Sequence, residues 1–339
     1  MYFPIFKNRM YENKVLRENS YLFKYKSITP IIEVISVKTD IPSIIKEYDN
    51  YLDDKYFLDF FTFEHGEFLH FTIKHVKFAL AIQNEDTYNY LDLLLETTAS
   101  TKAIPVLSIK KARSFILNHA KLEHYITVLQ SKKESIAIRL EGKYFDEYFP
   151  LIRKKLRKTD FFMFDIGNNN IDSFILQLYD FKEADVEFTS ILLNSPRSEK
   201  FNNGDYENEE YTSLINNLVA TVYKDYSFSG FGDYLGLKNE LPSDGGRGLG
   251  CALILMYDYN KNKFFSIVNA SVEDGLLGYR KILPKLLSYK YMLDPENNCL
   301  AYKYIDKHIG PKYGKYGNWA TWKYILMLRT LSEMKKVYK

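Results

Sequence analysis

Apolar residues follow two alternating patterns along the first two thirds of the chain. Short runs rich in β-branched and aromatic residues are typical of strands, and they occupy residues 2–6, 28–35, 56–63, 103–109, 135–140, 161–166, 186–193 and 226–231. Segments with apolar residues at helical spacing lie between them, at residues 41–52, 112–130, 144–156 and 171–181. A further segment, 68–96, is long enough for two helices with a break near residues 84–86. This alternation predicts an α/β fold.

The number of strand-like runs selects one α/β architecture. Eight strands joined by helical crossovers match a (β/α)8 TIM-barrel-like fold, and roughly 240 residues to the eighth strand fit its usual size. A doubly wound open sheet is the alternative, but no G-x-G-x-x-G string follows the first run, so the dinucleotide-binding fingerprint is absent. We therefore predict one (β/α)8-like domain over residues 1–339. Its strands should pair in parallel in chain order, with the first closing on the eighth.

The pattern changes after the eighth run. Residues 241–250 are glycine-rich, and residues 251–270 hold two apolar runs around Asn260–Lys261–Asn262, which is typical of a β-hairpin. Helical patterns follow near 278–291 and 319–337. We expect residues 241–270 to be a loop and hairpin inserted after strand eight, and the C-terminal helices to complete the outer ring.

Composition and charge narrow the class of protein. The chain is 46% apolar and 26% charged, as in globular proteins. It has no apolar run of the roughly 18–20 residues that a membrane helix needs, and its start does not resemble a secretion signal. Cys251 and Cys299 are the only cysteines, too few for a disulfide framework or a cysteine zinc site. We expect a cytoplasmic protein without a membrane partner.

One segment combines basic and aromatic residues. The net charge of +3 is mild, and the 29 Tyr and 24 Phe are spread over the whole chain. Residues 303–324 concentrate lysines and tyrosines. Stacking on nucleic-acid bases with cationic support is one interpretation. The other is a connecting loop that shares the bias of the whole chain.

Polar residues at strand ends are the candidates for chemistry, because TIM-barrel sites form where strands run into their following loops. Alternation along 135–141 and 161–166 predicts that Arg139 and Asp165 point into the barrel. The expected catalytic acids are Glu33, Asp59, Asp165 and Asp233, with Lys7 and Arg139 as ligand-binding cations.

Three kinds of site fit this set. The acids could hold a divalent cation such as Mg²⁺ while the cations bind a phosphate. They could instead form a structural ion-pair network that closes the barrel mouth. A carboxylate pair acting on sugars is a third option without a sequence signature. Asp233 itself could be a ligand at the end of the last strand, where Gly230 and Gly232 permit close approach, or a turn residue.

Several strings resemble one family. YFPIFKNRMYENKVLRE, TPIIEV, and SGFGDYLG ahead of a glycine-rich loop and hairpin resemble the beta-protein family, which is named for a T-even phage protein. The resemblance covers nearly the whole chain, and the matched positions are Tyr2, Pro4, Lys7, Arg9, Glu12, Pro30, Glu33, Gly232, Asp233 and Tyr234. It adds Arg9 and Tyr234 to the ligand-binding candidates. Family members are usually arginine-rich before the FGDY string, whereas residues 226–229 here are Tyr-Ser-Phe-Ser.

The resemblance implies a role in phage–host conflict, beside a nuclease-like protein partner. Together with the strand-end residues, it leads us to expect that the barrel mouth binds a phosphate-containing ligand, a nucleotide or nucleic acid, with hydrolysis left open. The alternative is a non-catalytic protein-interaction module or scaffold of a defence complex. An open pocket of converging side chains would favour an enzyme, and a closed mouth would favour the module.

Overall fold

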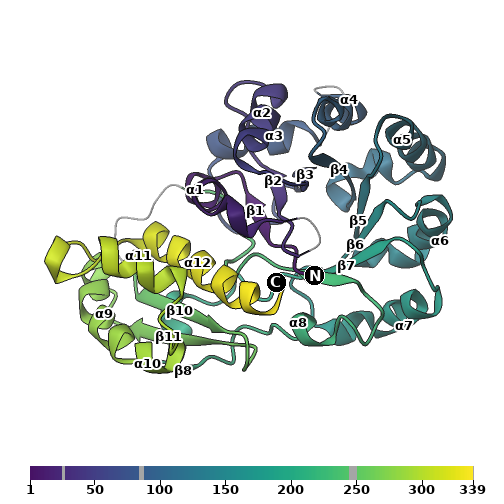
Figure 1. Ribbon diagram of the computed structural model, residues 1–339. Helices are drawn as coiled ribbons and strands as arrows, with labels where there is room; N and C mark the ends of the chain where they lie inside the picture. Colours follow the sequence, from purple (N-terminus) through teal and green to yellow (C-terminus); the bar gives the residue numbers. More distant parts are fainter. Residues whose placement is uncertain (25–26, 84–87, 244–249, 339) are drawn as a thin grey trace. The chain divides into compact units, whose positions relative to one another are not determined.

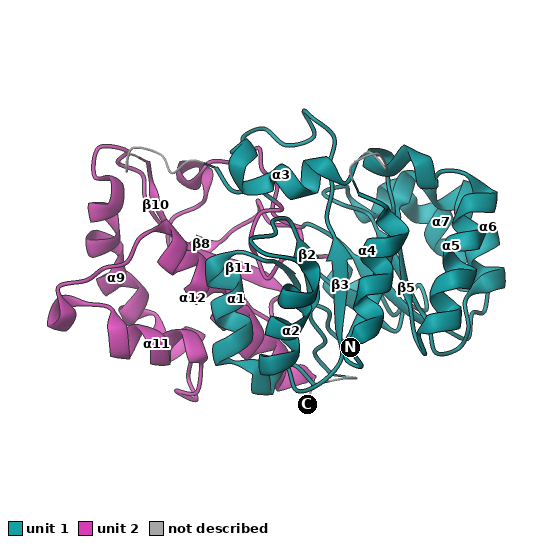
Figure 2. Ribbon diagram, turned by 90° about the horizontal axis from the view of Figure 1, so that it is seen from above, with its two compact units in different colours: residues 1–195, 219–233, 240–243 teal, residues 196–218, 234–239, 244–339 magenta. Residues whose placement is uncertain are grey.

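The computed structural model describes residues 1–24, 27–83, 88–243 and 250–338. The chain divides into two compact units (Figure 2). Unit 1 comprises Met1–Ser195, Val219–Asp233 and Glu240–Ser243, and unit 2 comprises Pro196–Leu218, Tyr234–Asn239 and Asp244–Lys339. This division describes compactness alone, so the expected single domain over residues 1–339 stays a prediction.

Unit 1 is built on an eight-stranded parallel sheet in the order β1-β2-β3-β4-β5-β6-β7-β9. The strands are β1 (Ile5–Lys7), β2 (Ile31–Val34), β3 (Tyr56–Phe60), β4 (Ala103–Ile109), β5 (Ala137–Glu141), β6 (Phe161–Asp165), β7 (Thr189–Leu193) and β9 (Gly230–Gly232). All seven pairings along this order are parallel. The predicted (β/α)8 architecture and its strand order are confirmed.

The sheet curls into a nearly closed barrel whose last strand meets the first. The Phe3 amide donates to the Phe231 carbonyl at 2.8 Å, and the Ile5 amide donates to the Asp233 carbonyl at 2.7 Å. A Cβ at Gly232 would lie 2.2 Å from the Phe3 carbonyl oxygen, so only glycine permits this approach. The expectation that the glycines near Asp233 allow a close backbone contact is confirmed for the closing strand.

Helices surround the barrel strands (Figure 1). Those of unit 1 are α1 (Met10–Glu18), α2 (Ile41–Tyr51), α3 (Ile73–Ala81), α4 (Tyr90–Glu96), α5 (His119–Lys132), α6 (Phe145–Lys155), α7 (Ile175–Glu183) and α8 (Val219–Val222). Helix α2 shows why these segments form helices. The Asp40 side chain accepts a hydrogen bond from the Ser43 amide at the N-terminus, and the apolar residues Ile45 and Tyr48 are buried on one face. Both helices predicted within 68–96 are present as α3 and α4. Residues 84–87, where the break was expected, lie outside the described residues.

Unit 2 contains an antiparallel sheet in the order β10-β11-β8. Strands β10 (Ala252–Asp258) and β11 (Lys263–Asn269) form the predicted hairpin, whose turn ends at Asn262 with φ of 50°. Strand β8 (Glu210–Tyr211) joins the edge of β11 and was not predicted. Residues 244–249 of the glycine-rich loop lie outside the described residues.

The C-terminal helices belong to unit 2. They are α9 (Gly278–Ser288), α10 (Lys290–Leu293), α11 (Leu300–His308) and α12 (Trp319–Val337). Helix α12 packs on β10 and α9 packs on β11, which gives the hairpin a hydrophobic core of its own. The expectation that these helices complete the outer ring stays a prediction. None of the helices in the described ranges is long and apolar enough to cross a membrane.

Candidate functional site

Arg139 is the centre of a charged network inside the barrel. Its Nη1 lies 2.7 Å from Glu33 Oε1 and 3.0 Å from Asp59 Oδ2, while its Nη2 lies 2.6 Å from Asp165 Oδ2. These partners come from β2, β3 and β6, and Arg139 comes from β5. A side chain that reaches three other strands must point to the barrel interior, as the alternation predicted for Arg139 and Asp165.

Register explains why the first three strands supply neighbouring charges. Lys7 pairs with Glu33 across β1 and β2, and Glu33 pairs with Asp59 across β2 and β3. The Lys7 ammonium lies 2.8 Å from Glu33 Oε2. The Ser108 hydroxyl donates to Asp59 Oδ1 at 2.7 Å. We call Lys7, Glu33, Asp59, Arg139 and Asp165 the Arg139 network.

The Arg139 network is shielded from water. The Lys7, Glu33 and Asp59 side chains are 0% exposed, and that of Arg139 is 9% exposed. Burial alone would raise the pKa of Glu33, but Lys7 and Arg139 outweigh it and lower the pKa to about 2. Burial lowers the pKa of Lys7, against the effect of Glu33. Glu33 is therefore ionised at neutral pH and held by two cations.

Asp233 lies directly after β9 and ties the closing strand to the N-terminal segment. Its side chain is buried, and its Oδ1 accepts a hydrogen bond from the Tyr2 hydroxyl at 2.8 Å. Its carbonyl accepts the Ile5 amide. Both contacts support barrel closure, so Asp233 has a structural role whatever else it does.

The structure brings together five of the eight residues expected to form the site, and these are the members of the Arg139 network. Arg9 lies between β1 and α1, directly before the helix. Its Nε pairs with Glu12, and its Nη1 donates to the Glu240 carbonyl at 3.2 Å. Tyr234 is buried and belongs to unit 2. Within the described ranges, no group of three His, Cys, Asp or Glu side chains is arranged to hold a metal ion. The acids of the network instead contact Lys7 and Arg139.

A pocket of about 580 Å³ opens beside the loops that follow β1 and β2. We call it the α1–α2 pocket, because both helices contribute to its wall. Its lining includes four basic side chains, and Glu47 is the one acid among the described residues that line it. The basic residues are Arg9, Lys14, Arg17 and Lys38, with His75 nearby on the wall. Sequence reasoning identified Arg9 alone, because Arg17 and Lys38 lie beyond the strand ends.

Asn8 fixes the two loops that form the pocket. Its Oδ1 accepts the amides of Ile35 at 2.8 Å and Ser36 at 3.3 Å, and its Nδ2 donates to the Ser36 carbonyl at 2.6 Å. One side chain thus joins the β1–α1 and β2–α2 loops. A wall held in this way keeps its shape before a ligand arrives.

A second pocket, of about 340 Å³, lies at the ends of β3, β4 and β5. We call it the β4 pocket. Two ion pairs cross its lining: Lys111 to Glu64 at 2.7 Å and Lys143 to Glu141 at 2.7 Å. Lys110, directly after β4, also lines it, and its ammonium lies 4.1 Å from the centre of the Phe61 ring.

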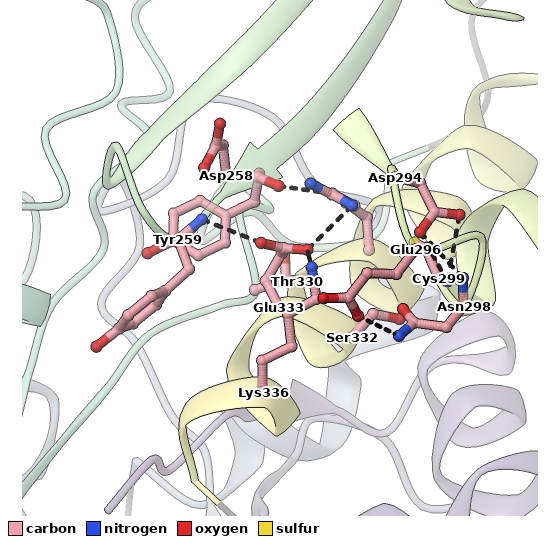
Figure 3. Close-up of polar contacts among 12 residues, drawn as sticks. Asp258, Tyr259, Asp294, Glu296, Asn298, Cys299, Thr330, Ser332, Glu333 and Lys336 are labelled. Atoms are coloured by element: carbon pink, nitrogen blue, oxygen red, sulfur yellow. Dashed lines mark hydrogen bonds and ion pairs between the residues drawn. The ribbon is translucent and has the colours of Figure 1, made fainter. Parts of the chain in front are cut away.

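Unit 2 has a polar cluster of its own, which sequence reasoning missed (Figure 3). Glu333 of α12 lies 3.0 Å from Arg329 and 2.7 Å from Lys336, and it accepts the Tyr259 amide at 3.3 Å. Arg329 Nε in turn donates to the Tyr257 carbonyl at 2.6 Å. These contacts fasten α12 to the end of β10, which is a structural role.

The basic-aromatic segment 303–324 uses much of its aromatic surface inside unit 2. Tyr324 is buried, Tyr304 packs against it with ring centres 4.8 Å apart, and the Trp322 indole donates to the Tyr316 carbonyl at 3.1 Å. Because these rings already contact other groups of unit 2, they favour the interpretation of residues 303–324 as a packed connecting segment. They do not favour a surface on which nucleic-acid bases stack.

Comparison with known proteins leaves the family open. No model of a known protein family matches this chain, and no curated protein matches it. The resemblance to the beta-protein family stays a prediction, as does the nuclease-like partner that it implies.

Proposed function

We propose that this protein binds a phosphate-containing ligand, a nucleotide or nucleic acid, in the α1–α2 pocket, and that this binding serves in phage–host conflict. The observation that carries the binding proposal is the set of basic side chains in the pocket, four against one lining acid in a space of about 580 Å³. Two of the four, Arg9 and Lys14, also pair with Glu12 and Glu18, so the exposed Arg17 and Lys38 contribute most of the positive charge offered to a ligand. Pockets of roughly 300–1,000 Å³ are typical of small-molecule sites. The phage role rests on the family resemblance alone.

Partial burial strengthens the attraction of this pocket for an anion. The Arg9 and Lys14 side chains are 21% and 29% exposed, so water and salt screen their charges less than those of fully exposed residues. Arg9 is also held in place by Glu12 and the Glu240 carbonyl. A guanidinium in a fixed orientation suits a phosphate, because its planar donors match two phosphate oxygens at once.

The Arg139 network supports binding without hydrolysis. Its three acids face cations at 2.6–3.0 Å and are largely buried, so we assign them to the barrel's structure rather than to a reaction. The same observation favours the second candidate function, a non-catalytic interaction module. The two candidates differ in whether the α1–α2 pocket binds a phosphate ligand.

Titration calorimetry with ATP at low ionic strength tests the binding proposal. The variant Arg17→Ala/Lys38→Ala removes two exposed pocket cations, and we expect at least about tenfold weaker binding. The matched control, Arg153→Ala/Lys154→Ala, removes two exposed cations from α6, away from the pocket. It should bind ATP as the wild type does.

Two results would count against the proposal: no binding of ATP or of a short single-stranded DNA by the wild type, or an equal loss in both double variants. The phage role has a separate test. Bacteria expressing the wild type or the control variant should resist phage plating, and bacteria expressing Arg17→Ala/Lys38→Ala should not. Equal plating on all strains would refute the phage role and leave the binding result intact.

A further inference from the structure

Lys110 occupies an unusual position in the barrel. It follows the last residue of β4 at the carboxyl end of the sheet, where barrel enzymes place reacting groups. Its ammonium lies over the face of Phe61, which follows β3, at 4.1 Å from the ring centre. The same residue lines the β4 pocket, whose rim includes the exposed residues His65, Lys111 and Lys143. The amine is therefore enclosed by protein yet borders a space that opens to solvent.

Burial and nearby cations disfavour the protonated form of Lys110. Burial lowers the pKa of Lys110, and Arg113 lowers it further, against the opposing effects of Asp59 and Glu67, so that the pKa is about 8. Arg113 is itself fully buried, 4.0 Å above the Tyr90 ring and 3.9 Å from Asp59. An ordinary lysine has a pKa near 10.4. Roughly a tenth of Lys110 is thus a neutral amine at pH 7, far more than of an ordinary lysine.

The neighbouring lysine offers an internal contrast. Lys111 is exposed and pairs with Glu64 at 2.7 Å, and the pairing raises its pKa. Two consecutive lysines therefore border the same pocket, and their pKa values are shifted in opposite directions. A lysine made neutral by burial and by a second cation is the form that attacks carbonyl groups.

We propose that Lys110 is a reactive amine that condenses with a small aldehyde or ketone bound in the β4 pocket to form an imine. The neutral Nζ attacks the carbonyl carbon, a C–N bond forms, and a proton passes from nitrogen to oxygen to give a carbinolamine. Loss of that oxygen as water leaves the C=N bond. The step changes no oxidation state. Glu64, Glu67 and Glu141 line the pocket as groups that can take and return the proton.

The pocket also bears on the kind of ligand. Its volume of about 340 Å³ suits a small molecule. Lys111 and Lys143 in its lining pair with Glu64 and Glu141, so their charges are already balanced and the lining sets size rather than charge. Glyoxylate is small and carries a reactive aldehyde, which makes it a suitable probe. This inference concerns a different pocket from the proposed phosphate site and does not depend on it.

Reductive trapping of the full-length protein tests the inference. Cyanoborohydride supplies the hydride that converts an imine with glyoxylate into a stable secondary amine, and peptide mass spectrometry then measures the rate at each lysine. We expect Lys110 to be modified at least about tenfold faster than Lys111 at pH 7.5. Its rate should reach half its maximum near pH 8. Because both lysines are followed in the wild-type protein, the comparison does not depend on how a variant folds.

Two substitutions sharpen this test. Lys110→Arg should abolish the fast modification, and Lys111→Arg should leave it unchanged. Modification of Lys110 no faster than that of Lys111, or a midpoint near pH 10, would overturn the inference and leave Lys110 as a structural cation over Phe61.

Discussion

Two groups of charged residues at the carboxyl end of the same barrel differ in how their charges are used. In the Arg139 network, acids and cations contact one another at 2.6–3.0 Å, and the side chains are largely buried. In the α1–α2 pocket, basic residues outnumber the acid and remain partly or fully exposed. Proximity to a strand end is common to both groups. Burial and charge balance separate a charge that holds the fold together from one that can bind a ligand.

The physical basis of this difference is desolvation. Moving a charge out of water costs several kcal/mol, which a buried partner offsets only when the geometry is good. Glu33, with Lys7 and Arg139 both within 2.8 Å, meets that condition. Displacing either cation toward a ligand would leave a buried carboxylate uncompensated. Arg17 and Lys38 of the α1–α2 pocket have no such constraint, because both side chains are exposed to water.

Removal of Arg139 should have the largest effect on stability. Arg139→Leu leaves Glu33, Asp59 and Asp165 without their shared partner, and we expect a loss of about 3–5 kcal/mol in the free energy of unfolding. Urea denaturation followed by circular dichroism measures it. Arg153→Ala on the exposed face of α6 is the control and should change stability by less than about 0.5 kcal/mol. A similarly small change for Arg139→Leu would show that the network does not hold the barrel together.

The pH dependence of stability should report Glu33. Its pKa is about 2 in the folded protein and near 4.3 in an unfolded chain, so the folded state binds fewer protons between these values. The stabilisation from Glu33 is complete above about pH 4.5 and is lost as the pH falls toward 2. Glu33→Gln should therefore have a lower free energy of unfolding than the wild type at pH 6. The difference between the two proteins should become smaller as the pH falls toward 2. Glu183→Gln, at an exposed position of α7, is the control and should be as stable as the wild type. An equal loss of stability at pH 6 and in acid for Glu33→Gln would contradict the role assigned to Glu33.

Asp233→Asn should have a moderate effect, because the substitution keeps an acceptor for the Tyr2 hydroxyl but removes its charge. We expect a loss of about 1 kcal/mol in thermal or urea unfolding. ATP binding and phage resistance should persist, since Asp233 does not line the α1–α2 pocket. Loss of either activity at unchanged stability would instead support the sequence-based hypothesis that Asp233 belongs to the functional site.

The smallest stability effect should come from the pocket itself. Arg17→Ala/Lys38→Ala removes two exposed side chains, and the unfolding free energy should stay within about 0.5 kcal/mol of the wild type. Differential scanning calorimetry at neutral pH provides the measurement. A marked destabilisation would mean that these cations serve the fold, as those of the Arg139 network do.

Much of the barrel could be predicted from the sequence. Each strand-like run between 2 and 231 appears in the parallel sheet, because the apolar runs, helical spacing and connection lengths all point to one architecture. Alternation along β5 also identified the inward direction of Arg139. The contacts of Arg139 with Glu33 and Asp59 could not be predicted, since they depend on how the closed barrel brings β5 opposite β2 and β3.

The two pockets were harder to predict for a related reason. Arg17 is on a helix and Lys38 is in a loop, and no periodicity links them to Arg9. The environment of Lys110 depends on Phe61, which follows β3, and on Arg113 from the turn after β4. Burial and through-space neighbours determine pKa and charge balance, and neither can be read along the chain. The two-residue strand β8 gave no signal because its pairing is set by β11.

Hydrogen–deuterium exchange of the full-length protein with and without saturating ATP locates the bound ligand. We expect slower exchange in peptides that cover residues 8–17 and 35–44, which form the walls of the α1–α2 pocket. Peptides around Arg139 and Asp165 should exchange at the same rate in both states. Protection confined to the strands of the Arg139 network or to unit 2, with none in residues 8–17 and 35–44, would refute binding in the α1–α2 pocket.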